Sequence, residues 1–147
     1  MILLIGYGNP MRSDDAAGIY AVNEITKKKI PGVVTATMQQ IQVELLEEAV
    51  YFDKVIFVDA GTGGDEVSMK KIRLSASELV STHHLSPELF LQLAKSIYEK
   101  DLDLYVCSIK GENFAVGNLL SAETAKRVRK AVDMICSLVG EASYARS

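Results

Sequence analysis

The sequence lacks the features that would place it in several large classes of protein. None of its apolar runs approaches the ~20 residues that a membrane-spanning helix needs. The net charge is -3, and the one short basic run is Lys27-Lys28-Lys29, so a nucleic-acid partner is not expected. The N-terminus has neither the charged nor the apolar region of a signal peptide, and we therefore expect a cytoplasmic protein.

Cysteine and histidine are scarce, with two residues of each. Cys107 and Cys136 lie far apart in apolar segments, which predicts free, buried thiols rather than a disulfide. The chain has no Gly-x-Ser-x-Gly elbow and no His-Glu-x-x-His sequence, so two common hydrolase motifs are excluded. Any imidazole ligand has to come from the adjacent pair His83 and His84.

The remaining composition is that of one ordinary globular domain. Hydrophobic residues make up 48% of the chain and charged residues 24%. A chain of 147 residues is long enough to bury one hydrophobic core. We therefore predict a single domain over 1–147, in which 141–147 form a frayed polar tail.

Hydrophobic patterning predicts strands that alternate with helices. This order implies a three-layer α/β fold, with a mostly parallel, five-stranded twisted sheet and helices on both faces. The strand at 67–74 is charged, which suits an exposed edge, and it is the strand that we allow to be antiparallel. We predict strands at 2–5, 33–38, 55–58, 67–74 and 102–109, and helices at 14–28, 43–51 and 86–98 and from 121 onward.

The first strand ends in a glycine turn, Gly6-Tyr7-Gly8-Asn9, which leads to the acidic pair Asp14 and Asp15. Open α/β sheets bind their ligands at such strand ends. The turn suggests a dinucleotide-binding fingerprint, but Met11 replaces the third glycine and the two acids would repel a pyrophosphate. We therefore interpret the glycines as allowing the backbone to turn sharply beyond the strand.

Acidic side chains are predicted to meet at this end of the sheet. Adjacent helical residues diverge by ~100°, so one of Asp14 and Asp15 can cap the helix while the other points into the crevice. Asp59 closes the buried strand 55–58, where a carboxylate is costly without a partner. If the first and third strands are neighbours, Asp15 and Asp59 lie close enough to share a proton or hold a cation.

One histidine would complete a donor set of two carboxylates and an imidazole. Such a set suits zinc, nickel or a similar ion and leaves coordination positions open. The alternative for Asp59 is a carboxylate that hydrogen-bonds only the amides of its own loop. The alternative for His83 is an ordinary histidine on the protein surface.

Four motifs together resemble the hydrogenase maturation endopeptidases, which trim the C-terminus of the nickel–iron hydrogenase large subunit. The resemblance extends over nearly the whole chain in order and spacing. It implies a single α/β domain and a soluble cytoplasmic enzyme that cleaves one peptide bond after nickel has entered the precursor. The motifs are Gly6-Tyr7-Gly8-Asn9, Asp14-Asp15-Ala16-Ala17-Gly18, Val55-Ile56-Phe57-Val58-Asp59-Ala60 and Ser81-Thr82-His83.

The resemblance also implies roles for individual residues. Asp15, Asp59 and His83 correspond to the two acids and the histidine that recognise the nickel carried by the precursor. Zinc or cadmium would replace nickel in the isolated protein. Met38–Gln42 stands where family members often carry a glycine-rich turn, so we expect recognition by this loop to differ. The residues that would support the site are Gly6, Gly8, Asn9, Asp14, Gly61 and His84, and His84 is also the alternative ligand to His83.

Two mechanisms and two functions stay open from the sequence. Nickel activates water or the scissile carbonyl in a metallo-type peptidase, whereas an acid acts as general base in an aspartic-type one. A metal carrier or assembly factor of the same fold would use the same three residues without cleavage. We expect a monomer, because no long apolar face is left exposed.

Overall fold

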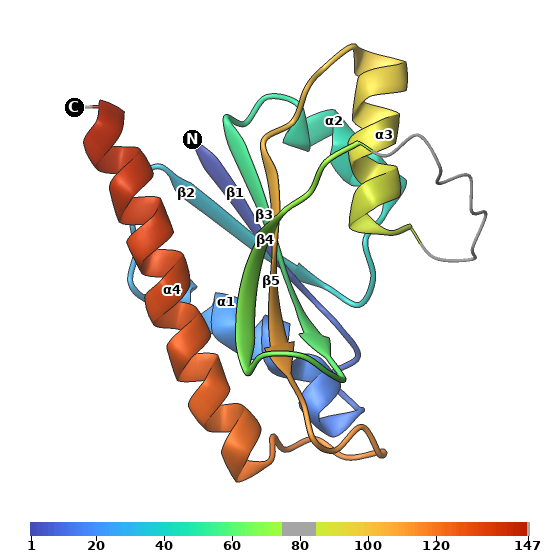
Figure 1. Ribbon diagram of the computed structural model, residues 1–147, viewed down its shortest axis with the longest axis vertical. Coiled ribbons are helices and arrows are strands. Elements are labelled where there is room, and N and C mark those ends of the chain that lie inside the picture. The colour runs from blue at the N-terminus through green and yellow to red at the C-terminus, as the bar shows by residue number, and fades with distance from the viewer. Residues whose placement is uncertain (75–84, 147) are drawn as a thin grey trace.

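Five strands form one central sheet with the order β2-β1-β3-β5-β4 (Figure 1). The structure, a computed structural model, describes residues 1–74 and 85–146, without the side chains beyond residue 140. The first four strands of that order are mutually parallel, and β4 is antiparallel to β5, as predicted. The strands are β1 (Ile2–Tyr7), β2 (Val33–Met38), β3 (Lys54–Gly61), β4 (Val67–Lys71) and β5 (Leu104–Lys110).

Helices cover both faces of the sheet, which confirms the three-layer fold (Figure 1). One face is covered by α1 (Ala17–Lys27) and α4 (Ala122–Arg146), and the other by α2 (Leu46–Ala49) and α3 (Pro87–Tyr98). The helical backbone of α4 continues to Arg146, through most of the segment that we predicted as a frayed tail. No helix in the described ranges is long and apolar enough to cross a membrane. Two 3-10 turns, η1 (Ser13–Ala16) and η2 (Val43–Leu45), precede α1 and α2.

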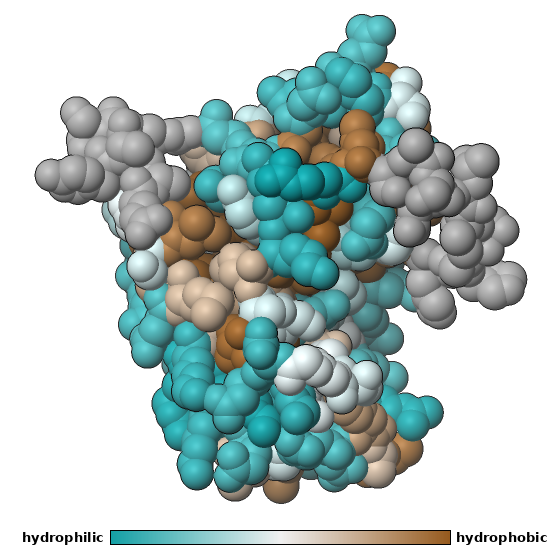
Figure 2. All heavy atoms as spheres, in the orientation of Figure 1, coloured by the Kyte–Doolittle hydropathy of each residue, from teal (hydrophilic) through white to brown (hydrophobic). Residues whose placement is uncertain are grey.

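Side chains that alternate along the buried strands divide the interior into two cores. On β1, Leu4 belongs to the core beneath α1 and α4, whereas Leu3 and Ile5 belong to the core beneath α2 and α3. The strand is apolar throughout because both of its faces are covered. On the face seen in Figure 2 the surface is mostly hydrophilic and hydrophobic residues show in separate patches.

The first helix lies very close to the sheet because glycines stand at the contact. A Cβ atom on Gly18 would lie 2.1 Å from the carbonyl oxygen of Val58, and one on Gly6 would lie 2.5 Å from the carbonyl oxygen of Gly18. Larger residues would push α1 away from β1 and β3. This close approach brings the start of α1, together with η1, beside the C-terminal end of β3.

Candidate active site

The two predicted acidic ligands lie at the C-terminal ends of β1 and β3, which are neighbours in the sheet. Asp59 is near the end of β3, and Asp15 is in η1, directly after the glycine turn. The structure brings both residues to one cavity of about 350 Å³. The other residues that line this cavity are Tyr7, Gly8, Gln39, Gln40, Ile41, Ala60 and Leu85.

The Asp59 carboxylate is largely buried and only half satisfied. Its Oδ2 accepts a hydrogen bond of 3.0 Å from the Tyr7 hydroxyl. Its Oδ1 is buried and has no hydrogen-bond partner in the described part of the chain. A buried acid with one free oxygen is typical of a site that takes up a cation or a proton.

Burial raises the pKa of Asp59 above that of an ordinary carboxyl group. The side chains of Ser108 and Tyr7 lower this pKa, although no hydrogen bond of standard geometry joins Ser108 to Asp59. The negative charges of Asp15 and Glu88 raise it further. The pKa of Tyr7 is also raised, by its own burial and by Asp59, so the phenol remains a hydrogen-bond donor at neutral pH.

Asp15 is held by the glycine turn itself. Its Oδ2 accepts a hydrogen bond of 2.7 Å from the backbone N–H of Asn9, whose own Oδ1 accepts one of 2.9 Å from the backbone N–H of Met11. Gly8 has φ +152°, and a Cβ atom there would lie 2.0 Å from the carbonyl oxygen of Asp15. Gly8 and Asn9 therefore support Asp15 structurally, through close approach and a backbone hydrogen bond.

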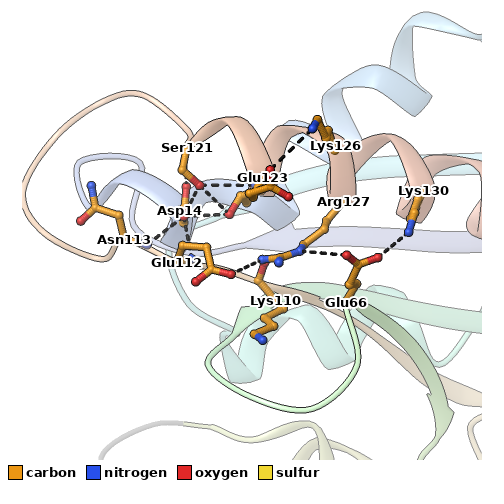
Figure 3. A network of polar contacts seen from close by, with 11 residues as sticks. Asp14, Glu66, Lys110, Glu112, Asn113, Ser121, Glu123, Lys126, Arg127 and Lys130 are labelled. Atoms are coloured by element: carbon orange, nitrogen blue, oxygen red, sulfur yellow. Dashed lines mark hydrogen bonds and ion pairs between the residues drawn. The ribbon is translucent and has the colours of Figure 1, made fainter.

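Asp14 serves a different part of the molecule, the loop between β5 and α4 (Figure 3). Its carboxylate is fully buried and accepts hydrogen bonds from the backbone N–H groups of Glu112, Asn113 and Ser121 at 2.8–2.9 Å. It also accepts hydrogen bonds of 2.8 Å from the hydroxyls of Ser121 and Thr124. Neither acid caps α1, so our prediction of that cap is wrong: Asp14 instead binds Ser121, the residue before α4.

These hydrogen bonds fix the ionisation state of Asp14. Burial by itself raises the pKa of this carboxyl group. The backbone N–H groups of Ser121, Glu112 and Asn113 outweigh burial, and the pKa lies well below the ordinary value. Asp14 is therefore an anionic anchor for the loop, which is a structural role.

The predicted histidine ligands His83 and His84 lie outside the described residues. Within 1–74 and 85–146, no group of three His, Cys, Asp or Glu side chains is arranged to hold a metal ion. Gly61 is the last residue of β3, and a Cβ atom there would lie 2.9 Å from Ser108 Oγ. Asp15 and Asp59 thus supply two oxygen donors at the cavity.

Cysteine chemistry is excluded at this cavity. Cys107 is free and buried within β5, and Cys136 is free and only partly buried. Burial raises the pKa of the Cys107 thiol to about 12, so it is not a thiolate nucleophile at neutral pH. The prediction of free thiols is confirmed, whereas the prediction that both are buried holds only for Cys107.

Carboxamide side chains form one wall of the site. A second cavity of about 520 Å³ is lined by Asn9, Asp15, Gln39, Gln40 and Gln42, and it shares three of these residues with the first. The sequence indicated that the loop Met38–Gln42 stands in place of a glycine-rich turn. The structure shows that the departure places donor and acceptor groups beside Asp15.

Tyr7 and Ser108 are not among the predicted site residues. The register pairs Gly6 with Val58, which puts Tyr7 level with Asp59, and it pairs Asp59 directly with Ser108. Side chains at one level of parallel neighbours share a face of the sheet. Tyr7 is the last residue of β1 and Ser108 lies two residues before the end of β5, but the register between strands was needed to place them beside Asp59.

The fold is the one found in hydrogenase maturation proteases of known structure. The NiFe hydrogenase maturation protease HybD from Thermococcus kodakarensis has a TM-score of 0.72 and 21% identity, over 93% of this chain and 97% of that chain. The hydrogenase maturating endopeptidase HybD from Escherichia coli has a TM-score of 0.77 and 17% identity, over 96% of this chain and 93% of that chain. The NiFe hydrogenase maturation protease HycI from Thermococcus kodakarensis has a TM-score of 0.76 and 23% identity, over 95% of this chain and 92% of that chain.

No protein-family model matches the sequence, and no curated protein matches it either. The likeness therefore lies in the fold, which agrees with the resemblance seen in the four motifs. Three of those motifs contribute residues to the first cavity, among them Asp15 and Asp59.

Proposed function

We propose that this protein is a hydrogenase maturation endopeptidase that removes the C-terminal extension of the nickel-loaded large-subunit precursor. The observation that carries the proposal is the cavity shared by Asp15 and Asp59. It lies within a fold whose neighbours, matched over more than nine tenths of both chains, are named hydrogenase maturation proteases. The substrate is a protein, and its nickel is part of what is recognised.

Asp15, Asp59 and His83 are the proposed ligands for that nickel. Carboxylate and imidazole donors suit nickel, and zinc or cadmium would take the same donors in the isolated protein. Once the nickel is held at the cavity, the scissile bond of the precursor is positioned beside these residues.

The cellular setting follows from the same proposal. The precursor of a cytoplasmic assembly step would meet the protease in the cytoplasm, where we expect this protein to act as a monomer. No nucleic acid or resident cofactor is required. Size-exclusion chromatography coupled to light scattering measures the oligomeric state directly.

A processing assay tests the function. Nickel-loaded and nickel-free precursors are incubated with the wild-type protein, and the products are followed by intact mass. We expect the loss of a C-terminal peptide only from the nickel-loaded precursor. His83→Ala should abolish this cleavage, and a loss of cleavage in His84→Ala but not in His83→Ala would identify His84 as the ligand.

An unchanged precursor mass in every arm would contradict the endopeptidase. A nickel titration of the same protein then tests the alternative, a metal carrier or assembly factor of the same fold. Cleavage that proceeds equally well without nickel would leave a peptidase but remove nickel from its recognition.

A further inference from the structure

One of the two oxygens of the Asp59 carboxylate is already occupied within the protein. The Tyr7 hydroxyl donates to Oδ2 at 3.0 Å, whereas Oδ1 is buried and has no hydrogen-bond partner among the described residues. The two oxygens are therefore distinct before any ligand arrives. A free carboxylate can rotate and exchange its oxygens, and a charge-assisted hydrogen bond to one of them opposes this exchange.

The ring that carries this hydroxyl is itself fixed. Tyr7 is the last residue of β1, and its ring meets Phe57 edge to face, with centroids 6.0 Å apart at 87°. Phe57 in turn meets Phe90 of α3 at 5.2 Å and 86°. These contacts join the end of β1 to β3 and α3, so the hydroxyl is directed at Asp59 by a packed aromatic row.

No other described side chain takes the place of this donor. Asp15 and Glu88 carry negative charge and repel the carboxylate of Asp59. Ser108 is the register partner of Asp59 on β5 and its side chain lowers the pKa of Asp59, but no hydrogen bond of standard geometry joins the two side chains. Tyr7 is thus the one residue whose hydrogen bond orients the acid within the ranges that the structure describes.

We infer that Tyr7 is a positioning residue that holds Oδ2 of Asp59 and leaves Oδ1 as the single oxygen for a metal ion carried by the substrate. This inference rests on the proposed function, because it assigns an orientation to one of its ligands. The ion would then be bound by one oxygen of Asp59 rather than by both. Residues that hydrogen-bond a metal ligand set its orientation in this way in many metal sites.

Cadmium titration of the purified full-length protein tests the inference without requiring cleavage. The test variant is Tyr7→Phe, which removes the hydroxyl and keeps the ring. We expect its cadmium affinity to fall by about 10- to 100-fold, the usual effect of losing a residue that orients a metal ligand. The Michaelis constant for nickel-loaded precursor should rise by a similar factor, with a smaller change in kcat.

Tyr20→Phe is the matched control. The Tyr20 hydroxyl also donates one hydrogen bond, to the carbonyl oxygen of Asn118 at 3.3 Å, but it lies on α1 away from the cavity. The affinity of Tyr20→Phe for cadmium should equal that of the wild type. Ser108→Ala should lose less cadmium affinity than Tyr7→Phe, and a loss as large as that of Tyr7→Phe would overturn the particular role of Tyr7.

The outcomes separate this inference from the proposed function. Cadmium binding that weakens in Tyr7→Phe, together with no cleavage by the wild type, would support Tyr7 and reject the endopeptidase. Equal affinities in wild type and Tyr7→Phe would overturn the role of Tyr7 alone. A wild type that neither binds cadmium nor cleaves precursor would overturn both, and a Tyr7→Phe protein that fails to fold would show that the hydroxyl is structural.

Discussion

Asp14 and Asp15 are adjacent in the sequence, but their carboxylates bind different parts of the protein. Asp14 is fully buried and accepts hydrogen bonds from the loop after β5 and from the start of α4. Asp15 accepts one from the turn after β1 and lines the cavity that contains Asp59. The divergence follows from the helical geometry of η1, in which neighbouring side chains point in different directions. Asp14 therefore anchors the loop between β5 and α4, and Asp15 lines the cavity.

Replacing Asp14 should mainly lower stability, whereas replacing Asp15 should mainly lower activity. Asp14→Ala leaves several buried N–H groups without an acceptor, so we expect the free energy of unfolding to fall by about 4 kcal/mol. Asp15→Ala removes one hydrogen bond at a partly exposed position and should cost about 1 kcal/mol. Chemical denaturation measures both values. We expect Asp15→Ala to fold and lose precursor cleavage, and a folded, fully active Asp15→Ala would contradict its place in the site.

The pKa of Asp14 predicts how stability depends on acidic pH. Its folded-state pKa is lower than its unfolded-state value, so its stabilising contribution is complete above the ordinary pKa of 3.8. The contribution is lost as the pH falls through the folded-state pKa. The stability difference between wild type and Asp14→Asn should therefore be constant near neutral pH and shrink below about pH 4. Urea denaturation at a series of pH values checks this, and a constant difference down to pH 2 would contradict it.

The layers of the fold could be predicted because they depend on local patterns. The apolar run 55–58 and the helical spacing of apolar residues after Pro87 both report the side chain's immediate surroundings. The network of Asp14 could not be predicted, since its partners Glu112 and Ser121 are 98 and 107 positions away. Nothing in the sequence near Asp14 marks those partners, because their approach is set by the packing of α4 on the sheet.

The register between the strands is likewise set by long-range packing that the local sequence does not mark. Asp59 was a candidate because it ends a buried strand, which is a local signal. Tyr7 became part of the site only when the register placed it level with Asp59 and the aromatic contact with Phe57 fixed its ring. The sequence therefore predicted Asp15 and Asp59, which the structure places at one cavity, and it missed Tyr7, whose place beside Asp59 depends on the register.

The close approach of α1 to the sheet predicts a strong effect of adding one methyl group. Gly18→Ala would bring a Cβ atom to 2.1 Å from the Val58 carbonyl oxygen, so α1 has to shift. We expect a loss of about 3 kcal/mol in the free energy of unfolding. Gly140→Ala is the matched helical control, because a Cβ atom there meets nothing within 4 Å.

The control should be stabilised by up to about 1 kcal/mol, since alanine is the better helix former. Thermal unfolding of both variants provides the comparison. Equal melting temperatures for Gly18→Ala and wild type would show that α1 has room to move and that the contact does not fix η1 beside β3. Because Asp15 is carried by η1, a shifted α1 should also weaken precursor cleavage.

Asp59 predicts a conflict between stability and activity at the same residue. The folded-state pKa of Asp59 is raised above its unfolded-state value. The wild-type free energy of unfolding is therefore highest at acidic pH and falls as the pH rises through the folded-state pKa. Asp59→Asn carries no charge, and without substrate at pH 7 it should be more stable than wild type by about 1 kcal/mol. The gain should vanish below about pH 4, where the wild-type carboxyl is protonated in both states. Denaturation of the two proteins at about pH 3 and at pH 7 tests this, while the processing assay should show that Asp59→Asn has lost cleavage. An Asp59→Asn protein that is less stable at pH 7 would mean that the carboxylate is satisfied within the protein, and the free Oδ1 would no longer indicate a ligand.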